Sequence, residues 1–256
     1  MEKLQDIYKV ASNAKLCTKF YRLCIDAKPI IKKARPGQFI HIRTQDGLEP
    51  FFRRPFSIYR AKEYIEILYE VVGPGTGLLA SKQKGDNIDV LGPVGTPFSL
   101  PPKGTKNVVM IAGGIGVAPF LFLSDVLKKQ KCALTLLYGG RTGGHVYNMR
   151  EFKDDGCKVY TATDDGSVGV KGHVSKLFSK IDPDPKTTFI YTCGPNLMMA
   201  SVQAFARKHK LQGEAACEEV MACALGACLG CSIQTTKGFK TVCCDGPAFN
   251  LQEIVF

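Results

Sequence analysis

The chain has 256 residues, of which 45% are hydrophobic and 22% charged, with 26 glycines and 14 prolines. This globular composition excludes disordered, collagen-like and low-complexity proteins, and the length favours two domains with a small third piece. The net charge of +11 does not indicate nucleic acid as a partner, because the basic residues are dispersed and the residues from Gly213 onward carry more acids than bases.

No apolar run approaches the roughly 20 residues of a membrane span, and the N-terminal residues lack an apolar signal core, so we expect a cytoplasmic protein without a membrane span. In such a compartment, a chain with 11 cysteines suggests metal or redox chemistry before disulfides. Five cysteines are scattered singly, and the others lie in the last 44 residues: Cys217, Cys223, Cys228, Cys231, Cys243 and Cys244.

Residues 1–100 show short segments in which apolar and polar side chains alternate, which is typical of strands with one buried face. The predicted strands include Phe39–Arg43, Tyr64–Val71 and Asn87–Val90, with turns at Pro36-Gly37, Gly73-Pro74-Gly75 and Gly92-Pro93. This spacing predicts a small antiparallel β-barrel.

Residues 101–212 alternate apolar strands with helices, which predicts a parallel-sheet α/β domain that binds its ligand beyond the carboxyl ends of the strands. The predicted strands are Val108–Ala112, Leu134–Tyr138, Val159–Ala162 and Phe189–Thr192, and the predicted helices are Phe120–Lys129 and Asn196–Lys210. Residues 213–256 form the third, cysteine-rich domain, so the predicted fold class is multidomain, α/β and β.

Three motifs in the first two domains are placed where they could contact ligands. Arg53-Arg54-Pro55-Phe56-Ser57 and the later Gly73–Gly77 segment can hold phosphate groups and place a hydroxyl near a flavin ring, although surface arginines and a plain turn are the alternatives. Gly113–Pro119 joins a strand to a helix, where a glycine turn accepts a pyrophosphate or only turns the chain. Cys193-Gly194-Pro195 ends a strand, where the cysteine either meets a ligand or packs in the core.

The strongest motif is Cys223-x4-Cys228-x2-Cys231 with Cys243 further on, which is the spacing of plant-type 2Fe-2S sites. A tetrahedral zinc site and a set of reduced thiols are the alternatives. Cys217 or Cys244 could also act as a ligand on spacing alone. Adjacent cysteines on an extended segment point to opposite sides, so we expect only one of Cys243 and Cys244 to face a cluster.

Together these motifs resemble those of ferredoxin-NADP reductase-type modules, and with the cysteine segment last, the whole chain resembles the electron-transfer subunits of NAD-dependent class 1B dihydroorotate dehydrogenases. The resemblance implies FAD, NAD(H) and a 2Fe-2S cluster as cofactors. It implies Arg54, Pro55, Phe56, Ser57, Gly75 and Thr76 for FAD, Gly114, Gly116 and Cys193 for the nicotinamide nucleotide, and Cys223, Cys228, Cys231 and Cys243 for the cluster. Ser57 and Cys193 would be the catalytic residues.

The family further implies an FMN-containing catalytic subunit that oxidises dihydroorotate in pyrimidine biosynthesis, in a heterotetramer with two of each subunit. The alternatives are the small subunit of an NADH-dependent ferredoxin-NADP oxidoreductase and a non-catalytic, zinc-stabilised basic binding module. NAD and NADP also remain open: Arg141 could receive a 2′-phosphate, whereas Asp164-Asp165 would repel one if they line the pocket.

Overall fold

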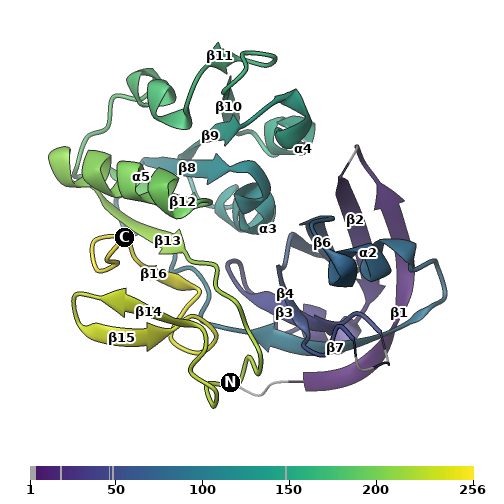
Figure 1. The fold of residues 1–256 in the computed structure, drawn as a ribbon. Helices are drawn as coiled ribbons and strands as arrows, with labels where there is room; N and C mark the ends of the chain where they lie inside the picture. Colours follow the sequence, from purple (N-terminus) through teal and green to yellow (C-terminus); the bar gives the residue numbers. More distant parts are fainter. Residues whose placement is uncertain (1–3, 18, 46, 48, 148) are drawn as a thin grey trace.

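An antiparallel sheet forms the first part of the molecule, and it curves into a half-barrel (Figure 1). The computed structural model describes residues 4–17, 19–45, 47, 49–147 and 149–256. The strand order is β4-β3-β7-β1-β2-β6-β5. The bounds are β1 (Leu4–Lys15), β2 (Phe20–Asp26), β3 (Phe39–Arg43), β4 (Arg54–Ser57), β5 (Arg60–Ala61), β6 (Ile65–Glu70) and β7 (Asn87–Val94), with a short helix α1 (Lys28–Ile31). The predicted antiparallel architecture is confirmed. The predicted domain begins at residue 1, and its residues 1–3 lie outside the described residues.

The alternating pattern of the strands explains how this sheet buries both faces. In β6, Ile65 and Ile67 fill the interior of the half-barrel, while Leu68 on the opposite face belongs to a second core shared with the next domain. In β3, Ile40 enters the half-barrel core and Phe39 a third core beside the C-terminal segment. Each face therefore meets a different neighbour, and the half-barrel lies against both other parts of the chain.

The segment predicted as a turn at Gly73-Pro74-Gly75 is instead the start of helix α2 (Pro74–Ser81). Proline suits the first turn of a helix because its missing N–H has no partner to lose there. The Thr76 hydroxyl accepts hydrogen bonds from the amides of Val72 (2.9 Å) and Gly73 (3.2 Å), which fixes this helix end. The prediction of a turn here was wrong, because glycine and proline also begin helices. The turn predicted at Gly92-Pro93 was wrong as well, because both residues lie within β7.

A second sheet, parallel except at one edge, carries the order β11-β10-β9-β8-β12-β13-β16. Its strands are β8 (Asn107–Gly113), β9 (Ala133–Gly140), β10 (Lys158–Thr163), β11 (Val170–Lys171), β12 (Thr188–Cys193), β13 (Gln212–Ala216) and β16 (Ala248–Asn250). The helices are α3 (Ala118–Leu127), α4 (Met149–Asp154) and α5 (Asn196–Lys208), with short 3-10 turns at Gly114–Val117, Gly143–His145 and Val174–Lys180. The predicted parallel α/β architecture is confirmed.

The C-terminal segment lies below β13 in Figure 1 and is continuous with the parallel sheet. It contains a hairpin of β14 (Ser232–Thr235) and β15 (Gly238–Thr241), and β16 then returns to pair with β13. Thr96, after the half-barrel, forms a bridge with Pro247. The boundary placed between residues 212 and 213 therefore falls at the beginning of β13, and the segment contacts both sheets.

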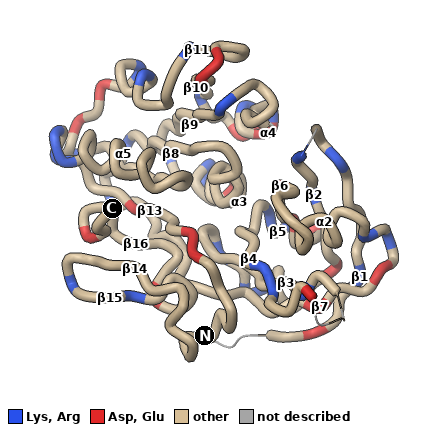
Figure 2. Tube along the Cα trace, in the orientation of Figure 1, with Lys and Arg blue, Asp and Glu red and all other residues tan. Residues whose placement is uncertain are grey.

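Charge and hydropathy add two findings about the surface. Lys and Arg residues are distributed over both sheets and the C-terminal hairpin (Figure 2). Within the described ranges, no helix is long and apolar enough to cross a membrane.

A network of charged side chains links the half-barrel to α3 and α4. Arg60 donates to Asp125 (Nε to Oδ2, 2.7 Å) and to Glu151 (Nη1 to Oε2, 2.7 Å), and Glu151 also pairs with Arg22 at 2.7 Å. The Arg60 and Asp125 side chains are only 13% and 7% exposed. The remaining members of the network are Lys62, Glu66, Lys128 and Asp155. Removing one charge from such a half-buried network leaves its partners with less compensation for their lost hydration.

We therefore predict that Arg60→Met lowers the free energy of unfolding by about 2 to 3 kcal/mol, because Asp125 and Glu151 each lose their least exposed cationic partner and keep only more exposed ones. Lys62→Met is the matched control, since the Lys62 side chain is 54% exposed and its pair with Asp125 is worth about 1 kcal/mol or less. Urea unfolding of both variants measures the difference. Equal losses in the two variants would show that the Arg60 pairs stabilise the fold no more than the exposed Lys62 pair does.

The same network predicts a dependence on pH. Burial by itself raises the pKa of Asp125, but hydrogen bonds and charges from Lys62 and Arg60 outweigh burial and lower this pKa below its ordinary value. A lowered pKa in the folded state stabilises the protein above the unfolded-state pKa, and this contribution is lost as pH falls through the folded-state pKa. The free energy of unfolding should therefore decrease below roughly pH 4, and less steeply in Arg60→Met. Parallel slopes in urea titrations at several pH values would contradict this.

Candidate functional site

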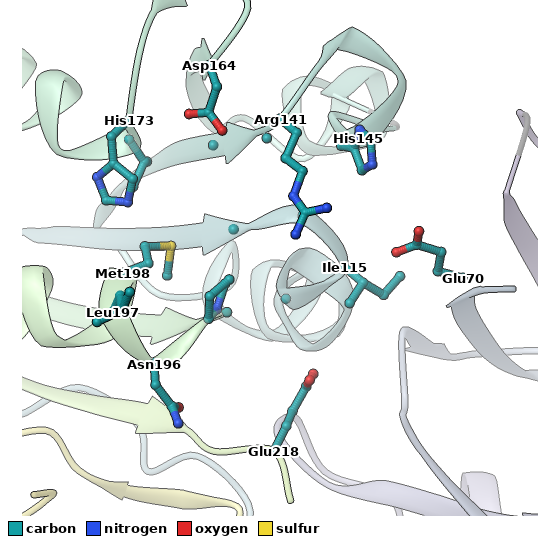
Figure 3. Close-up of a pocket in the computed structure, with 18 of the residues that line it drawn as sticks. Glu70, Ile115, Arg141, His145, Asp164, His173, Asn196, Leu197, Met198 and Glu218 are labelled. Atoms are coloured by element: carbon teal, nitrogen blue, oxygen red, sulfur yellow. The ribbon is translucent and has the colours of Figure 1, made fainter. Parts of the chain in front are cut away.

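A cavity of about 770 Å³ lies at the carboxyl ends of the parallel strands. Its walls are Gly113–Gly116 after β8, Gly140 and Arg141 after β9, Asp164 after β10, and Gly194–Met198 after β12. Figure 3 shows Arg141, Asp164 and His173 on one side of this space and Asn196 and Glu218 on the other. This is the position where open parallel sheets bind their ligands.

The glycine loop in this cavity is shaped by two different demands. Gly114 has φ of +55° and open space around it, so its conformation favours glycine. At Gly116, a Cβ atom would lie 2.4 Å from the carbonyl oxygen of Cys193, so only glycine permits the loop to approach β12 so closely. Both residues line the cavity, as the sequence predicted for a nucleotide loop.

Cys193 is the last residue of β12, and its side chain is only 1% exposed. It lies behind the cavity wall, whereas the following Gly194 and Pro195 line the cavity. Burial raises the pKa of the thiol well above its ordinary value, and the charges of Glu218 and Cys217 add to this. The thiol is therefore neutral. The assignment of Cys193 as a catalytic residue stays a prediction.

A second cavity, of about 630 Å³, opens along β4 of the half-barrel. Its wall includes Arg54, Pro55, Phe56, Ser57 and Thr76. These residues were singled out from the sequence, and the fold brings them to one surface.

Gly75 lies beside this cavity, at the beginning of α2. A Cβ atom there would be 3.0 Å from Nε of Arg54, so the guanidinium lies close over the first turn of the helix. The unpaired amides of a helix N-terminus and a guanidinium both favour a phosphate group. The Thr76 hydroxyl is engaged with the backbone of Val72 and Gly73, so its role at this position is to fix the helix end.

The two cavities are adjacent, because they share a wall made by Glu70, Val72, Ile115, Asn196 and Glu218. The sequence analysis missed Glu218. Its side chain opens into the cavities, yet the surrounding protein raises the pKa of the carboxyl group by burial. Its position two residues after β13, at the carboxyl edge of the parallel sheet, is the signal that could have identified it.

The three cysteines of the C-x4-C-x2-C motif and Cys243 form two pairs in the C-terminal segment, of which the first is Cys223 and Cys228. Burial acts to raise the pKa of Cys223, but hydrogen bonds from the amides of Leu225, Cys228 and Ala227 and from the Cys228 thiol lower it to about 6. The second pair is Cys231 and Cys243, and burial together with hydrogen bonds to Cys231 and Cys244 raises the pKa of Cys243 to about 12.

This pairing fits a two-iron cluster. Each iron of such a cluster is tetrahedral, and two of its four positions are taken by bridging sulfides, so each iron needs one pair of thiolates. The loop between Cys223 and Cys228 turns through positive φ at Ala224 (+54°) and Gly226 (+82°), which directs backbone amides toward the Cys223 sulfur. Within the part of the chain that the structure describes, no three His, Cys, Asp or Glu side chains are grouped as ligands of a single metal ion.

The remaining two candidate ligands occupy different positions. Cys217 is buried directly after β13, where it lines the half-barrel cavity, whereas Cys244 lies in the C-terminal segment with its Sγ 3.8 Å from that of Cys243. The expectation that Cys243 and Cys244 point to opposite sides was therefore wrong. It assumed an extended segment, but residues 242–245 form a turn.

Two adjacent cavities, one on a parallel sheet and one on an antiparallel half-barrel, define a nucleotide-dependent oxidoreductase module with a cysteine-rich electron-transfer segment. Residues 110–204 match the family model of the oxidoreductase NAD-binding domain, and residues 218–255 match that of the iron-sulfur cluster binding domain of dihydroorotate dehydrogenase B.

Curated relatives extend the likeness to the whole chain. A dihydroorotate dehydrogenase B (NAD(+)) electron transfer subunit from Desulforamulus reducens is 36% identical over 99% of this chain and 97% of its own length. The subunit of the same name from Clostridium acetobutylicum is 35% identical over 100% and 99%. The chain belongs to this family of electron transfer subunits, so it is an oxidoreductase component that works with a catalytic subunit.

Solved structures share the fold. An NADH-dependent reduced ferredoxin-NADP oxidoreductase structure superposes with a TM-score of 0.86 at 28% identity, over 97% of this chain and 89% of that chain. A ferredoxin NADP+ reductase from Neisseria gonorrhoeae with bound FAD and NADP gives a TM-score of 0.68 at 19% identity, over 80% and 91%. The second likeness concerns the fold alone.

Proposed function

We propose that this chain passes electrons between NAD(H) and the FMN of a dihydroorotate dehydrogenase catalytic subunit, through FAD and a 2Fe-2S cluster, in pyrimidine biosynthesis. The observation that carries the proposal is the shared wall of the two cavities, from which the chain continues from Glu218 directly to Cys223. When bound, a flavin links two-electron nicotinamide chemistry to one-electron cluster chemistry. The division into residues 1–100, 101–212 and 213–256 assigns one cofactor to each part.

The half-barrel cavity is proposed as the FAD site. Arg54 and the first turn of α2 at Gly75 would hold phosphate oxygens, and Pro55 and Phe56 would line the wall beside them. Ser57, at the end of β4, offers a hydroxyl on the same surface, near the wall shared with the nucleotide cavity.

The nucleotide cavity is proposed to bind NAD(H), with Gly114 and Gly116 at the pyrophosphate. Cys193 would act from behind this wall through its backbone, which Gly116 contacts. In the C-terminal segment, Cys223 and Cys228 would hold one iron, and Cys231 and Cys243 the other.

The catalytic subunit is proposed to dock where the cluster segment reaches the surface. Cys228 is exposed there, together with the apolar side chains of Leu225 and Leu229. The family resemblance supports a heterotetramer with two of each subunit, located in the cytoplasm, where the 11 cysteines stay reduced.

The test is an anaerobic absorption spectrum before and after NADH, followed by an assay with the catalytic subunit. Flavin and iron-sulfur bands that both bleach with NADH, and dihydroorotate-dependent reduction of NAD+ only in the mixture, would support the proposal. A small subunit of an NADH-dependent ferredoxin-NADP oxidoreductase is the second candidate, favoured by the TM-score of 0.86. If turnover occurred with the large subunit of that enzyme and not with the dihydroorotate dehydrogenase catalytic subunit, the second candidate would be supported.

We predict that Gly116→Ala weakens NADH binding at least about tenfold, or about 1.4 kcal/mol. The added Cβ would collide with the Cys193 carbonyl group and push the loop into the cavity. Gly144→Ala is the control, because a Cβ there meets only the Thr142 hydroxyl oxygen at 3.5 Å. Calorimetric titration with NADH measures both. Equal affinities of the two variants for NADH would show that the glycine loop does not bind the nucleotide.

We predict that Asp164→Asn increases the preference for NADPH over NADH about tenfold in kcat/KM, since a carboxylate in the cavity repels a 2′-phosphate and accepts from a ribose 2′-hydroxyl. Asp165→Asn is the matched control, because the Asp165 carboxylate is turned to Ser167. Reduction of FAD by each nucleotide gives the ratio. A change in the Asp165 variant alone would contradict the assignment.

Cys228→Ala should reduce electron transfer to the catalytic subunit by about 100-fold or more while FAD reduction by NADH changes less than about twofold, because the cluster loses a ligand. Cys132→Ala, outside the C-terminal segment, controls for loss of a thiol. Stopped-flow reduction and the coupled assay separate the two steps. Full turnover in Cys228→Ala would exclude the cluster path.

A further inference from the structure

Cys243 and Cys244 lie in a tight turn that places both thiols on the same side. The amides of Cys244, Asp245 and Gly246 all donate to the Thr241 carbonyl oxygen, at 3.3, 2.8 and 3.2 Å. The Asp245 carboxylate accepts from the amide (2.8 Å) and hydroxyl (2.9 Å) of Thr241, which closes the turn from the other side. The resulting distance between the two Sγ atoms is 3.8 Å.

The Cys244 thiol also contacts the loop that carries the first cysteine pair. A Cβ atom on Gly226 would lie 2.8 Å from Sγ of Cys244, and Gly226 itself has φ of +82°. Cys243, in contrast, is 1% exposed and faces Cys231. The Cys244 thiol therefore lies between Cys243 and the loop of residues 223–228, at the exposed side of the site.

We propose that Cys244 is a fifth thiol of the cluster site and a reserve ligand that can replace Cys243 on its iron. The inference rests on the proposed function, since it assumes that Cys243 binds iron. In the exchange, the bond between iron and Sγ of Cys243 breaks, the Cys244 thiol transfers its proton to the released Cys243 thiolate, and a bond forms between iron and Sγ of Cys244. No electron is gained or lost.

The first experiment compares Cys243→Ala, Cys244→Ala, the double variant and Cys228→Ala in the full chain, purified anaerobically. Alanine is used because a serine oxygen could itself bind iron. Iron and sulfide content per FAD, and the paramagnetic resonance spectrum after reduction, are the readouts. We expect Cys244→Ala to match the wild type, Cys243→Ala to keep more than about half of the iron with a shifted spectrum, and the double variant and Cys228→Ala to lose nearly all of it.

A second measurement does not depend on folding of a variant at buried Cys243. Wild-type protein, Cys244→Ala and Cys132→Ala are incubated with an iron chelator, and bleaching of the cluster band is followed. A reserve ligand recaptures iron after transient loss of Cys243, so Cys244→Ala should lose iron several-fold faster than the wild type. Cys132→Ala, which removes a thiol outside the C-terminal segment, should lose iron at the wild-type rate.

Two results would overturn the proposal that Cys244 is a reserve ligand. In the first, the wild-type protein holds a cluster but Cys243→Ala holds no more iron than Cys228→Ala. In the second, the wild type and Cys244→Ala lose iron to the chelator at equal rates. The proposed function would survive either result. Wild-type protein without iron would overturn both proposals.

Discussion

The packing of α3 against the half-barrel is the contact on which both cavities depend. Phe120 and Leu121 of this helix enter a core with Phe20 and Leu68 of the antiparallel sheet, and Phe122 enters the interior core of the half-barrel. Since α3 begins directly after the glycine loop, this packing also fixes where the loop stands relative to the half-barrel. The apolar core supplies most of the free energy, because burial of such side chains contributes roughly 1.5 to 3 kcal/mol each.

The charged network beside this core has a different role. A half-buried ion pair gains little net free energy, because the loss of hydration offsets most of the Coulomb attraction. Its geometry is specific, however: Glu151 accepts from both Arg22 and Arg60, so a rotation of α4 against the half-barrel would break two pairs at once. The apolar core holds the domains together, and we infer that the network selects one orientation.

Sequence patterns predicted the two sheets well, because the alternation of Ile65, Glu66 and Ile67 in β6 and the apolar runs at β8 and β12 depend only on which faces are buried. They failed where the local backbone decides. Gly73-Pro74-Gly75 begins a helix, and Cys243-Cys244 lies in a turn closed by Asp245. Glu218 carries no spacing signature, so its place between the cavities followed only from the topology that brings β13 beside β12.

The wall shared by the cavities joins all three parts of the chain. Glu70 and Val72 come from the half-barrel, Ile115 and Asn196 from the parallel-sheet domain, and Glu218 from the segment that leads to the cysteines. A movement of the cysteine segment would therefore displace a carboxyl group that faces both cavities. Because Met221 of this segment packs with Phe39 of the half-barrel in one core, such a movement would also disturb the half-barrel cavity. A partner that binds the cysteine segment is thus connected through packing contacts to both cavities.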